Sequence, residues 1–204
     1  MRIEDIADRI IERASDKNRY IVSIAGPPGA GKSTFATALN TRLAAQGLRS
    51  KIIPMDGFHL DNEVLSSLGL LAKKGAPETF DIAGFVQLIN RLAGEEDHVA
   101  FPIFDRDRDL SIAEADVVTK SDQILIVEGN YLLIDQRPWS GLKALWDESI
   151  FINPEFDVLE ERLIGRWLDQ GHDMEKARER ALSNDIPNAR YVLENSFPAN
   201  IQIR

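Results

Sequence analysis

The segment that most constrains the fold of this chain is residues 26–33, Gly-Pro-Pro-Gly-Ala-Gly-Lys-Ser. It matches the pattern G-x-x-x-x-G-K-[ST], in which successive backbone N–H groups point inward and form a nest for anionic oxygens. The apolar run Tyr20–Ala25 before it predicts a buried strand, and Ser33–Ala45 after it predicts a helix that ends near Gly47. A strand, a glycine-rich loop and a helix in this order indicate a binding site for a nucleoside triphosphate.

Each part of this loop has an expected role. Glycines let the backbone take positive φ angles and approach the phosphates closely. Lys32 is expected to reach the β- and γ-phosphates, and the Ser33 hydroxyl to ligate Mg²⁺. A glycine-rich structural turn is the alternative, and the flanking strand and helix argue against it. The expected nucleotide-binding residues are Gly26, Pro27, Pro28, Gly29, Ala30, Gly31, Lys32, Ser33 and Thr34.

Composition excludes several classes of protein. The 204 residues contain no cysteine, which removes disulfides, thiolate catalysis and cysteine zinc sites. A net charge of −9 argues against a non-specific nucleic-acid binder. No apolar run approaches the ~20 residues of a membrane helix, and the charged N-terminus is not a secretion signal, so we expect a cytoplasmic location. With no linker or repeat, residues 1–204 are expected to form one domain with a small-molecule partner. The sequence leaves open whether the chain forms a homodimer.

Apolar runs alternate with helical patterns along the rest of the chain, which predicts an α/β protein with a mostly parallel sheet. Pro54 lacks an N–H, so it is expected at the end of a strand or on an edge strand. The predicted helices cover Ile3–Ala14, Asp81–Ala93 with Asp81 as N-cap, Glu155–Arg180 with a break near Gly171, and Asn188–Asn195. The predicted strands cover Lys51–Met55, His98–Phe104, Ile124–Val127, Ser149–Ile152 and Ile201–Ile203.

Two acidic residues each follow a predicted strand. Asp56 follows the strand Lys51–Met55, and Glu128 follows Ile124–Val127. Ligands of open parallel sheets sit at the carboxyl ends of the strands, so both carboxylates should converge on the phosphate loop. Glu128 can reach Mg²⁺ directly or through water, and Asp56 can accept the proton of an attacking hydroxyl. For Asp56, a turn formed by the Asp-Gly pair is the alternative.

Two short motifs resemble those of GTPases. Asp81–Gly84 matches D-x-x-G, and Thr119–Asp122 matches T-K-x-D. Neither segment follows an apolar strand, as each would in a GTPase, so we interpret the first as a helix cap and the second as a polar turn. ATP is therefore favoured over GTP.

Five segments together resemble the uridine kinase and pantothenate kinase group of P-loop kinases, in order from about residue 20 to about residue 200. They are Gly26–Thr34, Met55–Leu60, Thr79–Asp81, Phe101–Arg106 and Ile126–Tyr131. Within the group, the chain is most similar to the bacterial subgroup provisionally named fructose-transport-system kinases or fructokinases. The resemblance implies the P-loop NTPase fold, three layers α/β/α with a mostly parallel sheet, and a helical lid at about residues 155–185.

The resemblance also implies roles for residues around the loop. Asp56 would be the catalytic base, assisted by Lys32, and Ser33 and Glu128 would hold magnesium. The residues implied to contact the phosphate acceptor are Asp56, Phe58, His59, Phe104, Arg106 and Tyr131. For His59 a buried structural role is the alternative, and for Arg106 a cluster of surface ion pairs.

Further roles are implied for the lid and the C-terminal region. Arg166 would close over the γ-phosphate, and Arg162 lies four residues earlier on the same helix face. The alternative is a solvated charged face with Glu160 and Glu161 as partners. Asn188 falls where adenine would be contacted, and helix capping is the simpler interpretation there.

The acceptor itself stays open. Uridine kinases usually carry a Ser-Phe-Tyr-type sequence where this chain has Gly57-Phe58-His59, and pantothenate kinases are generally longer. The sequence predicts an ATP- and Mg²⁺-dependent kinase acting on a small metabolite, first a sugar such as fructose and second a nucleoside or a pantothenate-type acceptor. The alternative of another class is a nucleotide-binding regulatory module that does not transfer phosphate.

Overall fold

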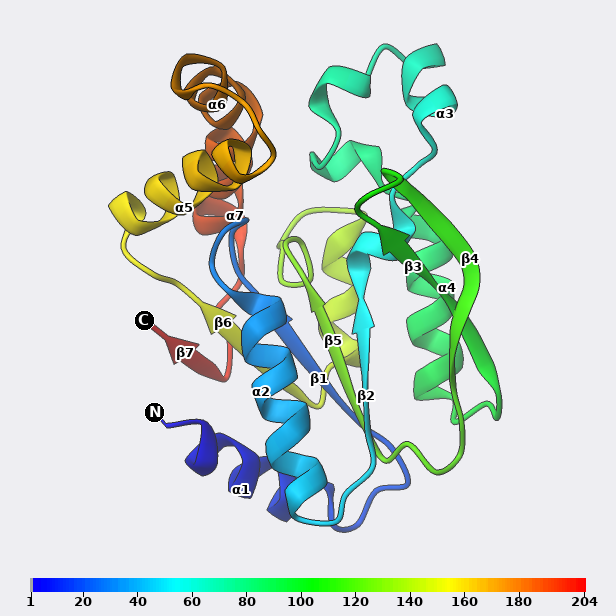
Figure 1. Ribbon diagram of the computed structural model, residues 1–204. Helices are drawn as coiled ribbons and strands as arrows, with labels where there is room; N and C mark the ends of the chain where they lie inside the picture. The colour runs from blue at the N-terminus through cyan, green and yellow to red at the C-terminus, as the bar shows by residue number, and fades with distance from the viewer. Residues whose placement is uncertain (1) are drawn as a thin grey trace.

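Five parallel strands form the central sheet of this computed structural model, which describes residues 2–204 (Figure 1). They are β1 (Tyr20–Ala25), β2 (Ser50–Pro54), β5 (Ile124–Gly129), β6 (Glu148–Ile152) and β7 (Ile201–Ile203), in the spatial order β2-β5-β1-β6-β7. Every residue of β1, β5 and β6 is buried, as expected for strands covered on both faces. Pro54 ends the edge strand β2, where its missing N–H costs no hydrogen bond of the sheet.

Helices cover both faces of the sheet, which confirms the predicted three-layer architecture. Successive residues of β1 point to opposite faces, so Val22 and Ile24 belong to one core while Ile21 and Ala25 belong to the other. The first core includes α1 (Ile3–Ala14) and α2 (Lys32–Ala45), and the second includes α4 (Ile82–Ala93), the 3₁₀ segment η4 (Trp139–Leu145) and part of α7 (Ile186–Asn195).

A β-hairpin stands apart from this sheet. It pairs β3 (Val99–Asp105) with the antiparallel β4 (Leu110–Val118), and only the first of these strands was predicted from the sequence. Between β2 and α4 the chain makes a further excursion that was not predicted. The excursion contains the 3₁₀ segment η1 (Met55–Phe58), α3 (Asn62–Ser67) and the 3₁₀ segments η2 (Leu71–Lys73) and η3 (Pro77–Thr79).

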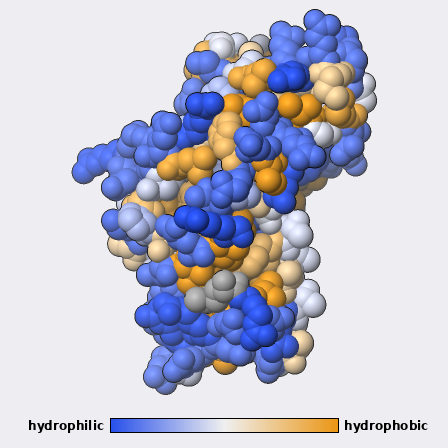
Figure 2. Space-filling view, turned by 90° about the vertical axis from the view of Figure 1, so that its left-hand side faces the viewer, coloured by the Kyte–Doolittle hydropathy of each residue, from blue (hydrophilic) through white to orange (hydrophobic). Residues whose placement is uncertain are grey.

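The predicted lid is helical and is interrupted where expected. It consists of α5 (Phe156–Asp169), α6 (Met174–Arg180) and the π-helical turn η5 (Ala181–Asp185), which continues into α7. Gly171, with φ +86°, lies in the turn between α5 and α6. Figure 1 shows α5 and α6 above the carboxyl ends of the strands, across from α3. From the lid side, Figure 2 shows a largely hydrophilic surface with hydrophobic patches in its upper and middle parts.

The two GTPase-like motifs are the structural features predicted for them. The Asp81 carboxylate caps α4 by accepting from the backbone N of Gly84 at 2.9 Å. The Asp122 carboxylate accepts from the backbone N of Thr119 at 2.8 Å and closes a turn. Over residues 2–204, no helix combines the length and the apolar character needed to cross a membrane.

Candidate active site

The loop between β1 and α2 has the backbone conformation that its glycines predict. Gly31 immediately precedes α2 with φ +92°, a left-handed conformation that favours glycine. A Cβ on Gly26 would lie 2.4 Å from the carbonyl oxygen of Ile152, so only glycine fits against β6. These constraints place the N-terminus of α2 and the loop N–H groups at the carboxyl end of the sheet. Thr34 is exposed on the first turn of α2, next to the loop.

Lys32 is the buried cation of this loop. Its ammonium donates to the carbonyl oxygen of Pro27 at 3.0 Å and to Asn130 Oδ1 at 2.6 Å. Burial lowers the pKa of Lys32, while the negative charges of Glu128 and Asp56 act in the opposite direction. Both carboxylates therefore lie close enough to influence the ammonium, which brings the predicted site residues together.

Ser33 and Glu128 contact each other directly. The Ser33 hydroxyl donates to Glu128 Oε1 at 2.9 Å. Burial raises the pKa of Glu128, against the effects of the Lys32 charge and of this hydrogen bond. A hydroxyl and a carboxylate beside a phosphate-binding loop are the oxygen ligands that Mg²⁺ uses together with phosphate oxygens and water. The described part of the chain contains no cluster of three acidic or histidine side chains that could hold a metal by itself.

Asp56 is held by an arginine from the hairpin. It lies in η1, directly after β2, and its Oδ2 accepts from Arg106 Nη2 at 2.9 Å. Arg106 follows β3, and its side chain is 67% exposed, whereas that of Asp56 is 28% exposed. The guanidinium is therefore largely in contact with solvent, whereas the carboxylate that it pairs with is mostly buried.

An aromatic wall lies next to Asp56. The His59 ring stands between Phe80, at 4.1 Å between ring centroids, and Phe104, at 4.7 Å. His59 Nδ1 also lies 2.8 Å from the carbonyl oxygen of Asp56. Burial lowers the pKa of His59, with the nearby Asp56 acting against this shift. The structure thus brings His59, Phe104 and Arg106 to the predicted acceptor side of Asp56.

Two predicted acceptor contacts lie elsewhere. Phe58 is 8% exposed and packs edge-on against Phe85 in the core. Tyr131 is 0% exposed, and its hydroxyl donates to the carbonyl oxygen of Gly75 at 2.6 Å. Neither side chain presents a surface to a ligand in this structure, so the predicted direct contacts are corrected to packing that supports the aromatic wall.

The two lid arginines have different partners. Arg162 Nη1 donates to the carbonyl oxygen of Gly29, in the phosphate loop, at 3.2 Å. Arg166 Nη2 donates to Asp185 Oδ1 at 2.8 Å, and Trp167 Nε1 donates to the other oxygen of the same carboxylate at 2.7 Å. The alternative, in which Arg162 and Arg166 lie on a solvated face and pair with Glu160 and Glu161, differs from these contacts. In this arrangement Arg162, rather than Arg166, touches the loop.

Asn188 lies inside α7 rather than at its cap, so the helix-capping interpretation is wrong. The Asn188 Nδ2 atom lies 3.3 Å from Asn184 Oδ1. Asn188 also lines a cavity of about 560 Å³ between the lid and the excursion that connects β2 to α4. Aromatic residues of that cavity are Phe80, Trp139 and Tyr191. A contact of Asn188 with adenine stays a prediction.

Sequence reasoning missed two residues of the site. Asn130, the partner of Lys32, lies two positions after Glu128, just beyond the end of β5. That position at a strand end was the available signal. Lys74, from the α3 excursion, places its ammonium 5.0 Å from the Phe104 ring centroid and donates to Asn62 Oδ1 at 2.7 Å. No pattern in the sequence pointed to it.

Comparison with known proteins places these residues in a family context. Residues 21–196 match the family described as Phosphoribulokinase / Uridine kinase. The chain is 37% identical to the uncharacterized protein YggC of Escherichia coli strain K12, over 94% of this chain and 80% of that protein. It is 32% identical to a provisionally named uridine kinase of Schizosaccharomyces pombe, over 98% of this chain and 89% of the yeast protein.

Among solved structures, the chain is similar over its whole length to one from Silicibacter sp. TM1040. That protein is provisionally named a fructose transport system kinase. The two share 43% sequence identity and superpose with a TM-score of 0.95, covering 100% of both chains.

Proposed function

Because the chain belongs to the Phosphoribulokinase / Uridine kinase family, and is therefore a kinase of the P-loop type, we propose that it transfers the γ-phosphate of MgATP to a hydroxyl of a small metabolite, first of all a sugar such as fructose. The observation that carries the proposal is the position of Asp56. Its carboxylate lies at the carboxyl end of β2 and acts electrostatically on Lys32 and Glu128. Among the described residues, it is hydrogen-bonded only by the exposed Arg106 side chain.

The loop would hold the triphosphate. Its N–H groups and the Lys32 ammonium would bind the β- and γ-phosphate oxygens. Ser33 and Glu128 would hold Mg²⁺, which would supply positive charge to the phosphate oxygens. Arg162 already lies against the loop, and Arg166 stands one helical turn further along α5, so the lid can add positive charge over the γ-phosphate.

Asp56 would act on the acceptor. When an acceptor hydroxyl replaces Arg106 on this carboxylate, Asp56 can accept the hydroxyl proton as the oxygen attacks the γ-phosphorus. His59 and Phe104 would then form the wall that orients the acceptor. Because His59 Nδ1 already contacts the carbonyl oxygen of Asp56, Nε2 is the ring nitrogen that would form a hydrogen bond with a sugar hydroxyl.

A sugar is the first acceptor class because the Silicibacter protein, 43% identical over the full chain, bears a fructose-related name. A uridine-like nucleoside is second. It is favoured by the name of the yeast relative. A pantothenate-type acceptor ranks beside the nucleoside as second candidate, on the resemblance described above.

The test is an ATP-consumption screen of the purified protein with sugars, nucleosides and pantothenate. We expect one acceptor class to stimulate ADP release. Replacing Asp56 by Asn should lower this stimulated rate by about 10²–10⁴-fold while ATP binding persists, because a general base contributes that much. Asp61→Asn is the matched control, since Asp61 is an exposed N-cap of α3 that Asn can replace.

Three outcomes would contradict parts of this proposal. Full turnover of Asp56→Asn would remove Asp56 as the base. ATP binding without stimulation by any acceptor class would favour a nucleotide-binding regulatory module. Stronger binding of GTP than of ATP in a competition assay would contradict the choice of nucleotide.

A further inference from the structure

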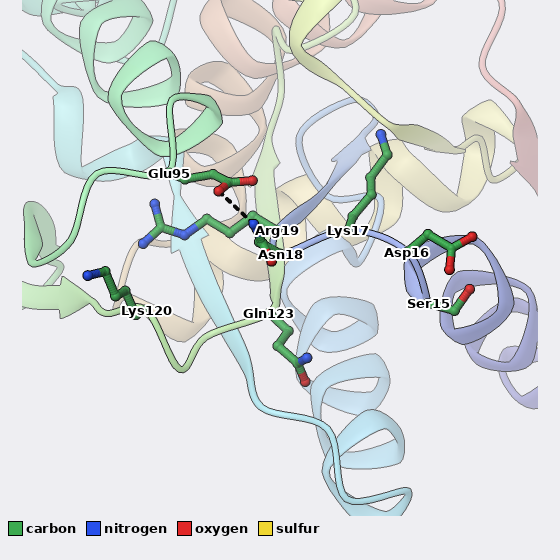
Figure 3. Close-up of a pocket in the computed structure, with 8 residues that line it drawn as sticks. All are labelled: Ser15, Asp16, Lys17, Asn18, Arg19, Glu95, Lys120 and Gln123. Carbon is green, nitrogen blue, oxygen red and sulfur yellow. Dashed lines mark hydrogen bonds between the residues drawn. The ribbon is translucent and has the colours of Figure 1, made fainter.

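A second cavity lies at the opposite end of the sheet from the phosphate loop (Figure 3). Its volume is about 640 Å³, within the ~300–1,000 Å³ of small-molecule sites. The segment just before β1 and residue Gln123 just before β5 place it at the amino ends of the strands. The lining residues beyond Ser15 and Asp16 are Lys17, Asn18, Arg19, Glu95, Lys120 and Gln123.

Arg19 is the residue of this cavity that the fold leaves incompletely paired. Its residue exposure is only 6%, and its Nη1 donates to the carbonyl oxygen of Leu92 at 3.2 Å. Its Nη2 is buried and has no hydrogen-bond partner, and no carboxylate of residues 2–204 forms an ion pair with it. A guanidinium is always charged, so this site buries a positive charge that makes no direct ion pair within the described residues.

The nearest acidic side chains are already engaged or lie elsewhere. Glu95 Oε2 accepts from Asn18 Nδ2 at 2.9 Å, and Asp147 pairs with Lys17. Asp97 pairs with Lys120 at 3.5 Å. Glu96 pairs with Arg91 at 2.6 Å, although it is near enough for the charge of Arg19 to help lower its pKa. In Figure 3 Asp16 lies at the far end of the segment, while the Arg19 guanidinium projects to the opposite side. Counted over the lining residues alone, three cations (Lys17, Arg19 and Lys120) lie beside two carboxylates (Asp16 and Glu95), although the whole chain carries −9.

We propose that this cavity binds a small anion, inorganic phosphate or a phosphate monoester, with Arg19 as its main anchor. The planar guanidinium fork suits phosphate oxygens, and a charge-assisted bond would satisfy the buried Nη2. Lys120, whose side chain is 77% exposed and whose pair with Asp97 is long, would add charge from the rim. The amides of Asn18 and Gln123 are further donors. This site is separate from the proposed transfer site and does not depend on it.

Binding is tested by titrating the full chain with inorganic phosphate, a hexose monophosphate and neutral hexose, followed by ¹H–¹⁵N NMR. All titrations use a Lys32→Ala background, because the phosphate loop would otherwise bind the same anions. We expect saturable shifts at the amides of Asn18 and Lys120 with the anions and none with neutral hexose. The phosphate and hexose monophosphate arms show which anion binds more tightly.

Arg19→Gln should weaken the binding by about tenfold or more, the size of a lost charge-assisted hydrogen bond. If Arg19→Gln does not fold, the exposed Lys120→Gln variant carries the test, with an expected loss of several-fold. Lys176→Gln, at an exposed lysine of α6, is the matched control and should bind unchanged. Absence of saturable shifts, or affinities equal in Lys120→Gln and the control, would overturn the proposal.

Discussion

Lys32 is the residue whose position most depends on a partner outside the phosphate loop. Burial of its ammonium makes each acceptor important, because an unsatisfied buried charge is costly. One acceptor is the Pro27 carbonyl of the loop itself, and the other is Asn130, at the end of β5. Asn130 therefore links the position of Lys32 to the strand that carries Glu128.

Replacing Asn130 by Ala should lower kcat/KM for ATP by about tenfold, because it removes one hydrogen bond to a charged group. The expected cause is a less ordered ammonium, so the effect should lie mainly in kcat. Steady-state kinetics with the best acceptor measure it, and Asn90→Ala on the exposed face of α4 is the matched control. Equal kinetics in both variants would show that Asn130 does not position Lys32.

His59 gives a pH dependence whose sign follows from its environment. Burial lowers its pKa, so below the ordinary value of about 6.5 the unfolded chain takes up a proton that the folded chain refuses. The folded state therefore loses stability as pH falls through that region. The His59→Gln variant lacks this titration, and the wild type should lose up to about 1.4 kcal/mol per pH unit relative to it.

Urea unfolding of both proteins at several pH values measures this difference. Above pH 7 the difference in unfolding free energy should be independent of pH, which serves as the internal control. If the difference in unfolding free energy stays constant down to pH 5, His59 is protonated as easily in the folded state as in the unfolded state.

At the level of elements, α1 is tied to the sheet by one buried carboxylate. Glu148, the first residue of β6, is 0% exposed and accepts from Arg9 Nε at 2.8 Å and from Arg13 Nη1 at 2.9 Å. The two arginines lie four residues apart and so share a face of α1. Ile6 and Ile10 on the same helix pack into the core beside them.

Glu148→Gln should lower the free energy of unfolding by about 1–3 kcal/mol, the range for lost charged hydrogen bonds. The loss should stay below that of a fully buried pair, because the Arg9 and Arg13 side chains are 39% and 48% exposed and can be hydrated again. The urea midpoint measures it, with Glu12→Gln on the exposed face of α1 as control. A loss no larger than that of the control would assign the anchoring to apolar contacts alone.

Elements with a regular pattern could be predicted from the sequence, and irregular ones could not. β1 and β5 consist mostly of apolar residues, and their predicted starts match the structure. In β4 the alternation is broken, because Glu114 takes φ +52° and the pairing with β3 shifts near Pro102. α3 is only six residues long and leaves Val64 exposed, so no apolar periodicity marks it.

For the whole molecule, the direction of the strands made part of the site predictable. Parallel strands end on one edge, and the structure brings Asp56 and Glu128 to the loop at that edge. The burial of Tyr131 and the reach of Arg162 depend on how the excursion and the lid pack over the sheet. Local patterns hold no information on that packing, so both were beyond sequence reasoning.

Nucleotide binding should also change the stability of the whole molecule. At a MgATP concentration of about 100 Kd, linkage adds about 2.7 kcal/mol, or roughly 5–10 °C in Tm for a chain of this size. Thermal unfolding with and without MgATP measures this. Lys32→Ala should lose most of the shift, and EDTA should reduce it in the wild type by removing Mg²⁺. An equal shift in Lys32→Ala would contradict binding at the phosphate loop.

The contact between Arg106 and Asp56 has a consequence for idle turnover. With Arg106 on its carboxylate, Asp56 has one of its two oxygens, Oδ2, already paired with a cation. Even with ATP bound, this oxygen of Asp56 would stay paired with Arg106 until an acceptor displaces the arginine. We expect ATP hydrolysis in the absence of acceptor to be slow for this reason, so that the cell's nucleotide is spared when no substrate is present.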